Sequence, residues 1–79
     1  MAATVQVYPN PSENGIFDFD ISASKIFEIS VSDLMGRIIS TPFFTGPRGR
    51  IDLSKFSTGM YMLRIQSDQG LIRSFFKKN

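Results

Sequence analysis

The chain contains neither cysteine nor histidine. Without cysteine it can form no disulfide and no thiolate metal site. Without histidine it lacks the commonest general base, the commonest side-chain metal ligand and the partner that would activate a serine nucleophile. Acyl-transfer triads are therefore excluded, and the packing of apolar side chains must hold the fold together.

Long apolar runs and dense charge clusters are missing as well. No apolar stretch approaches the roughly 20 residues that span a bilayer, and polar residues interrupt the N-terminal segment where an export signal would need an apolar stretch. The nine basic residues are spread along the chain, and the net charge is only +2. We therefore expect neither membrane insertion nor nucleic-acid binding.

The size of the chain suits a single domain. A length of 79 residues, of which 42% are hydrophobic, allows one small core and leaves nothing for a second. We expect this domain to span residues 4–79. Met1-Ala2-Ala3 resembles a short leader joined to a segment that was cut from a longer protein.

Apolar and polar residues alternate with a period of two, which is the pattern of a half-buried β-strand. Turn signals rich in glycine, proline and asparagine separate the alternating segments at intervals of about ten residues. No segment keeps a helical period over ten residues, so at most one helical turn is expected, around residues 54–57. The pattern predicts an all-β fold, an Ig-like antiparallel β-sandwich of about seven short strands. The expected strands are 5–8, 17–21, 27–32, 37–41, 50–53, 61–66 and 71–77.

The alternation also predicts which side chains face the core. In the strand 17–21 the three apolar residues lie on one face, and Asp18 and Asp20 lie on the other. In the strand 27–32 the same rule turns Phe27 inward together with the two aliphatic residues that follow it.

Tyr61 occupies a position that is informative in sandwich folds. It begins a strand after a loop, two residues beyond Gly59. Ig-like sandwiches often place a tyrosine at such a crossing, where its hydroxyl binds backbone a few residues upstream. The alternative is that Tyr61 is an ordinary amphipathic core residue.

Two groups of acidic residues could support chemistry. Asp18 and Asp20 share a strand face at a separation that an inverting glycosidase could use, but solvated alternation explains them without a cleft. Asp33, Asp52 and Asp68 could contribute oxygen ligands to calcium, yet Asp33 and Asp68 lie near glycine turns, where carboxylates commonly cap local backbone N–H groups. We therefore expect no enzyme activity, no catalytic residue, no bound metal and no cofactor.

Two pairs of adjacent phenylalanines, Phe43-Phe44 and Phe75-Phe76, must each direct one ring to each face of an extended strand. An exposed ring could stack on a sugar or bury in a partner protein. We expect such a contact more at Phe75 or Phe76 than at Phe43 or Phe44.

Several short motifs, taken in order, resemble one family. They are Tyr8-Pro9-Asn10-Pro11-Ser12 with Gly15 and Phe17, then Asp33 with Gly36 and Arg37, then Ile51-Asp52-Leu53-Ser54 before Gly59 and Tyr61, and finally Leu63-Arg64-Ile65, Gly70 and the basic tail Lys77-Lys78. In this order they are similar to the C-terminal sorting domain, type A, of cargo proteins of the type IX secretion system of Bacteroidetes. The resemblance covers nearly the whole chain.

This resemblance implies a targeting label that follows an N-terminal cargo domain. The cargo would cross the periplasm in transit and then be secreted or held at the cell surface. The implied partners are the outer-membrane secretion translocon and a sortase-like cysteine protease that removes the domain by cutting upstream of Val5.

A label needs a rigid shape and a reachable edge, and the last strand, residues 71–78, could offer one for strand addition. Lys77 and Lys78 could steer it toward an acidic partner, or they could simply protect an edge against aggregation. An accessory carbohydrate-binding or adhesion module of a secreted protein is the alternative function, and a structural spacer is a third. The recognition residues that we expect are Gly36, Arg37, Gly59, Tyr61, Phe75, Phe76, Lys77 and Lys78. The family more often ends in small β-branched residues beside its basic ones, and Met60 stands where an aliphatic β-branched residue is usual.

Overall fold

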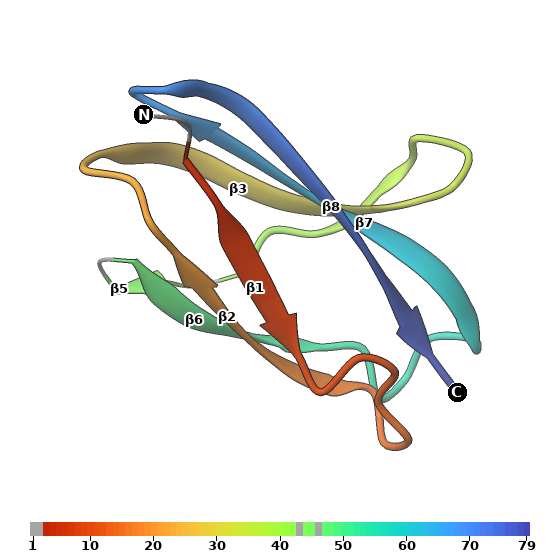
Figure 1. Ribbon diagram of the computed structural model, residues 1–79. Coiled ribbons are helices and arrows are strands. Elements are labelled where there is room, and N and C mark those ends of the chain that lie inside the picture. Colours follow the sequence, from red (N-terminus) through yellow and green to blue (C-terminus); the bar gives the residue numbers. More distant parts are fainter. Residues whose placement is uncertain (1–2, 43, 46) are drawn as a thin grey trace.

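The computed structural model describes residues 3–42, 44–45 and 47–79, and it shows two antiparallel β-sheets packed face to face (Figure 1). The first sheet has the strand order β1-β2-β6-β5, and the second sheet has the order β4-β3-β7-β8. The strands are β1 (Val5–Tyr8), β2 (Ile16–Ile21), β3 (Ile26–Asp33), β4 (Ile38–Ser40), β5 (Phe44–Thr45), β6 (Arg48–Asp52), β7 (Gly59–Ser67) and β8 (Gly70–Lys78).

The predicted all-β sandwich is confirmed. Each of the seven expected segments contains a strand. The structure adds β5, which was not predicted because two residues are too few to show an alternating pattern. Where a single helical turn was expected, around residues 54–57, the chain forms a turn over residues 53–56, closed by a bond from the Phe56 N–H to the Leu53 carbonyl at 3.0 Å. The described residues include no helix that is long and apolar enough to cross a membrane.

The core lies between the two sheets and consists of the inward residues of the alternating strands. The rings of Phe17 on β2 and Phe76 on β8 meet edge to face at 4.6 Å between centroids, so they join the two sheets directly. The buried hydrophobic residues are Phe17, Phe19, Ile21, Ile29, Val31, Ile51, Leu53, Tyr61, Leu63, Ile65 and Phe76.

The expectation that Phe27 faces the core is wrong. Its side chain is 64% exposed. The pairing of β3 with β7 shifts register between Ile26 and Glu28, so Phe27 falls at an irregularity, and the half-buried Ile26 packs against the core in its place. A register shift of one residue moves a side chain to the other face of a strand.

The predicted role of Tyr61 at a strand crossing is confirmed. Its hydroxyl donates a hydrogen bond to the backbone carbonyl of Ser57, four residues upstream. The ring is buried and stacks on Phe76 at 6.1 Å between centroids. Tyr61 therefore fixes the loop before β7 to the core of the second sheet.

Candidate functional site

The expected recognition residues gather at one end of the second sheet. Gly59 pairs with Lys78 and Tyr61 pairs with Phe76 across β7 and β8. On the other side of β7, Tyr61 pairs with Asp33, which opens the turn that contains Gly36 and Arg37. Cross-strand register thus brings together residues that are far apart in the sequence.

The two last phenylalanines split between the faces of β8, as the alternation required. Phe76 is completely buried, whereas Phe75 is 55% exposed on the outer face. The proposal of a contact residue therefore rests on Phe75 alone, and the expectation that Phe76 contacts a partner is wrong because its ring is part of the core.

Lys78 does not extend into solvent. It is only 8% exposed, and its Nζ donates to the backbone carbonyls of Leu53 at 2.9 Å, Ser54 at 3.2 Å and Phe56 at 2.5 Å. Its Cε also lies against Gly15, where an added Cβ would come within 2.9 Å of Lys78 and of the Leu53 backbone. The steering role expected of Lys78 is therefore wrong, since its ammonium already binds the loop that follows β6.

The Pro-Asn-Pro loop binds the end of β8. The Ser12 N–H donates to the Lys77 carbonyl at 3.0 Å, and the Asn79 N–H donates to the Ser12 carbonyl at 2.9 Å. The Lys77 N–H donates to the Asn10 side chain at 3.0 Å. The last residues of the strand thus have their outward backbone groups occupied within the domain.

In the middle of β8, the outward backbone groups are not bonded in the way that they are at the end of the strand. Because the Lys77 carbonyl and the Asn79 N–H point away from β7, the backbone groups of the other odd-numbered residues, Leu71, Arg73 and Phe75, point the same way. In the part of the chain that the structure describes, these groups have no backbone partner. Residues 71–75 therefore form an open strand edge.

The side chains along this edge point to the outer face of the second sheet. Leu71, Arg73, Phe75 and Lys77 are all exposed, and they alternate apolar and basic. A strand that paired with the edge would meet these four side chains.

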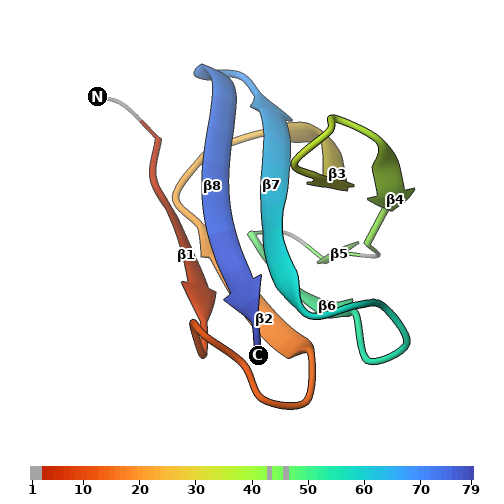
Figure 2. The same ribbon diagram turned by 90° about the vertical axis from the view of Figure 1, so that its right-hand side faces the viewer.

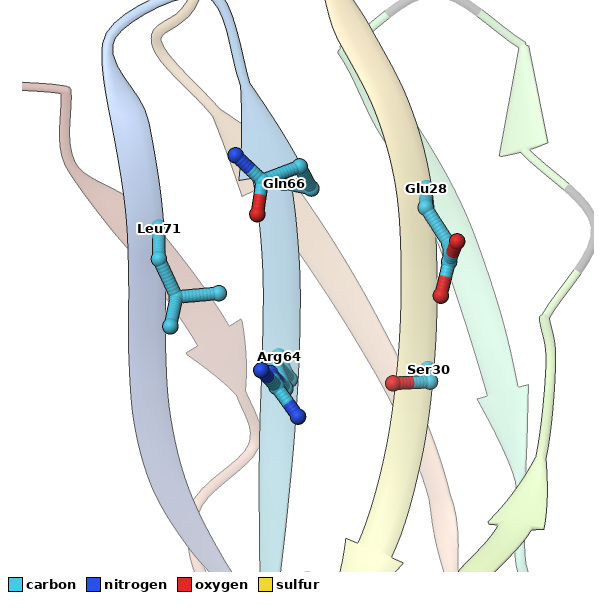
Figure 3. Close-up of a pocket in the computed structure, with 5 residues that line it drawn as sticks. All are labelled: Glu28, Ser30, Arg64, Gln66 and Leu71. Atoms are coloured by element: carbon cyan, nitrogen blue, oxygen red, sulfur yellow. The ribbon is translucent and has the colours of Figure 1, made fainter.

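The outer face of the second sheet carries a hollow beside this edge. Glu28, Ser30, Arg64, Gln66 and Leu71 line it from β3, β7 and β8 (Figure 3). Arg64 and Arg73 are not among the recognition residues that the sequence led us to expect. The turn length could have revealed this pair, because a two-residue turn at Asp68-Gln69 fixes the pairing of β7 with β8 and sets the two arginines opposite each other.

The turn carboxylates bind backbone N–H groups rather than one another. Asp33 accepts bonds from the N–H groups of Met35 and Arg37 and from the Arg37 Nε, at 2.9, 3.0 and 3.1 Å. Asp52 caps the N–H of Ser54 at 2.9 Å in the same way, whereas Asp68 accepts a bond at 3.1 Å from the N–H of Lys25, 43 residues away. The local capping expected at turns is therefore confirmed for Asp33, and the expectation is wrong for Asp68, whose carboxylate joins two loops that are distant in the sequence.

Asp18 and Asp20 lie on the outer face of the first sheet, each paired with an arginine of β6. The Arg50 Nε lies 3.0 Å from Oδ1 of Asp18, and the Arg48 Nε lies 3.4 Å from Oδ2 of Asp20. This arrangement is the solvated alternation that the sequence favoured over a catalytic pair. Phe43 and the side chain of Phe44 lie outside the described residues.

Comparison with known proteins gives one decisive match. The sequence profile of the secretion system C-terminal sorting domain matches residues 6–78. The chain belongs to this family. No curated protein and no solved structure matches it.

Membership of the family establishes the domain as a type IX secretion sorting domain, a class that the family ties to Bacteroidetes. Its cargo is a secreted or cell-surface protein, and the sorting domain interacts with the type IX secretion machinery. Sorting domains of this family are typically not catalytic.

Proposed function

We propose that this sorting domain is a non-catalytic label, spanning residues 4–79, that the outer-membrane translocon recognises through β8. The observation that carries the proposal is the open edge at residues 71–75, lined by exposed Leu71, Arg73 and Phe75. Main-chain bonds from a receptor strand would supply affinity, and the alternating side chains would supply specificity.

The neighbourhood of β8 supports strand addition. β1 lies beside β8 on the same side of the sandwich (Figure 2). Val5 and Val7 on β1 pack against the core but are only half-buried. A strand added to β8 would cover these two side chains as well, which adds apolar burial to the backbone bonds.

The cargo would reach the translocon from the periplasm, and a sortase-like cysteine protease would then cut upstream of Val5. The pairing of β1 with β2 from Val5 to Tyr8 protects the backbone at the start of the sandwich and favours cleavage before it. The mass of the mature cargo would locate the cut.

A proline scan of β8 in a reporter fusion tests the proposal. The reporter carries an N-terminal signal peptide and this domain at its C-terminus, in a Bacteroidetes host. Arg73→Pro removes an outward N–H without breaking a bond to β7, so the domain stays folded while strand addition is blocked. We expect the R73P fusion to remain in the periplasm and the R73A control to leave the cell in larger amounts.

Equal export of the R73P and wild-type fusions would contradict recognition through the edge of β8. Periplasmic retention of the wild-type fusion would contradict the sorting function itself. Glycan binding by the isolated domain, measured by calorimetry, would instead support a carbohydrate-binding module.

A further inference from the structure

Arg64 on β7 and Arg73 on β8 stand directly opposite each other on the outer face of the second sheet. Their backbone groups point away from each other, so they form a pair without hydrogen bonds, in which side chains come closest. Like charges directly opposite in a sheet are destabilising. The pairing therefore costs the isolated domain stability.

The other three arginines each have a carboxylate partner. Arg37 pairs with Asp33, and Arg48 and Arg50 pair with the two aspartates of β2. Within residues 3–42, 44–45 and 47–79, no carboxylate lies within 4.0 Å of Arg64 or Arg73. The two unpaired arginines are thus the two that oppose each other.

The surrounding charges leave the face basic. Glu28 is the acidic group on the outer positions of β3, β7 and β8, and it pairs with Gln66, one row away from the arginines. Figure 3 shows Glu28 on β3 and Arg64 on β7 lining the same hollow. Lys77 adds a third cation along β8, so this face carries three positive groups against one negative group.

The apolar residues of the same face indicate the shape of the missing partner. Phe75 pairs with Met62 next to the arginine row, and Leu71 borders it on the other side. Along the open edge, apolar and basic side chains therefore alternate with the period of a strand. An extended segment with acidic and apolar residues in alternation would match them in both charge and spacing.

We propose that Arg64 and Arg73 together bind a carboxylate of an acidic, extended segment of a protein partner that pairs with the edge of β8. This inference rests on the proposed recognition of β8 and names the chemistry of the recognising segment. Two guanidinium groups can enclose one carboxylate with charge-assisted hydrogen bonds. Binding would thereby remove the repulsion that the free domain contains.

A peptide titration of the 79-residue domain tests the proposal. The probe is a nine-residue capped peptide in which glutamate and leucine alternate on one face and threonine fills the other. Two further peptides carry glutamine or lysine in place of glutamate. Amide NMR shifts and amide exchange at Leu71, Arg73 and Phe75 report binding and added protection.

We expect the glutamate peptide to bind at least about tenfold more tightly than the glutamine peptide, the size of effect that a charge-assisted pair gives. The double variant R64E/R73E should lose the glutamate peptide and gain the lysine peptide. The variant K55E makes a charge change of the same sign in the loop before β7 and should leave both affinities unchanged.

Three results would overturn the proposal. They are no binding of the glutamate peptide at millimolar concentration, equal affinity for the glutamate and glutamine peptides, and no charge swap in the double variant. If inorganic phosphate shifts the Nε resonances of Arg64 and Arg73 while the glutamate peptide does not, the pair is a small-anion site and the peptide assignment fails.

The reporter fusion separates this inference from the sorting function. If R64E/R73E is exported as well as K55E while R73P is retained, the edge is recognised without the arginine pair, and only the inference fails. If the wild-type fusion is retained in the periplasm, the sorting function fails.

Discussion

The outer faces of the two sheets differ in how their charged side chains are paired across neighbouring strands. On the first sheet, β2 and β6 set Asp18 opposite Arg50 and Asp20 opposite Arg48, so each charge has its counterion across the strand. On the second sheet, the equivalent position across β7 and β8 holds two arginines. The four charges of the first face neutralise one another in pairs, whereas Arg64 and Arg73 on the second face have no carboxylate partner among the described residues.

Both faces are held in place by the one core between the sheets. Of the changes considered, Phe76→Ala should destabilise this core most. The change leaves a cavity where the ring meets Phe17 and Tyr61, and we expect it to reduce the free energy of unfolding by about 3 to 5 kcal/mol. Urea denaturation followed by circular dichroism measures the loss. The adjacent F75A is the matched control, and an equal loss there would show that the assignment of the two rings to inner and outer faces is wrong.

The second largest effect should come from Lys78→Met, because Lys78 attaches the second sheet to the loop after β6. The change leaves the buried carbonyl of Leu53 and its neighbours without their donor. We expect a loss of about 2 to 3 kcal/mol in the same denaturation experiment. K77M should change stability little, since that side chain is exposed. Similar losses in both variants would contradict a structural role specific to Lys78.

Charge reversal should affect the two faces with opposite signs. Arg73→Glu creates an attractive pair with Arg64 and should stabilise the domain by about 0.2 to 1 kcal/mol, while Arg50→Glu sets like charges opposite Asp18 and should destabilise it by a similar amount. Thermal unfolding at low salt measures both changes. High salt should shrink them together. A destabilised R73E would refute the repulsion between Arg64 and Arg73.

The smallest effect concerns Asp52, at the end of β6 on the first sheet. Hydrogen bonds donated by the Ser54 hydroxyl and the Ser54 N–H hold the pKa of Asp52 below its ordinary value. A lowered pKa in the folded state gives stability that is present above pH of about 4, the ordinary value, and is lost as pH falls through the folded pKa.

The variant Ser54→Ala should raise the pKa of Asp52 toward the ordinary value, because it removes the hydroxyl donor that contributes most. An NMR titration of the Asp52 carboxyl carbon measures this shift. An unchanged pKa of Asp52 in S54A would assign the lowering to another group.

Local sequence patterns were sufficient to predict where the strands lie and which side chains of β2 face the core. The seven expected segments and the inward Phe17 and Phe19 follow from the period of two. Phe27 escaped the rule because a register shift in the pairing with β7 is a property of two strands together. A single strand carries no sign of it.

The site was only partly predictable for a related reason. The sequence identified β8 and required one ring of the Phe75-Phe76 pair to be buried, but it did not say which. Once Phe76 is known to face inward, Lys78 must face inward too, since residues two apart share a face. The contact of Ser12 with the end of β8 joins segments more than 60 residues apart along the chain and had no local signal.

The anchoring of Lys78 and Asn79 has a consequence for biosynthesis. The loop at Ser12 and the loop at Leu53 are both completed only by the final residues of β8. A chain that stops before Phe76 lacks the ring that joins the sheets and the Lys78 ammonium that binds the loop at Leu53. It also lacks the backbone groups of Lys77 and Asn79 that bind the loop at Ser12. Such a truncated product would lose the contacts that hold β8 in place, so the same contacts that stabilise the domain would restrict export to cargo that carries the whole of β8.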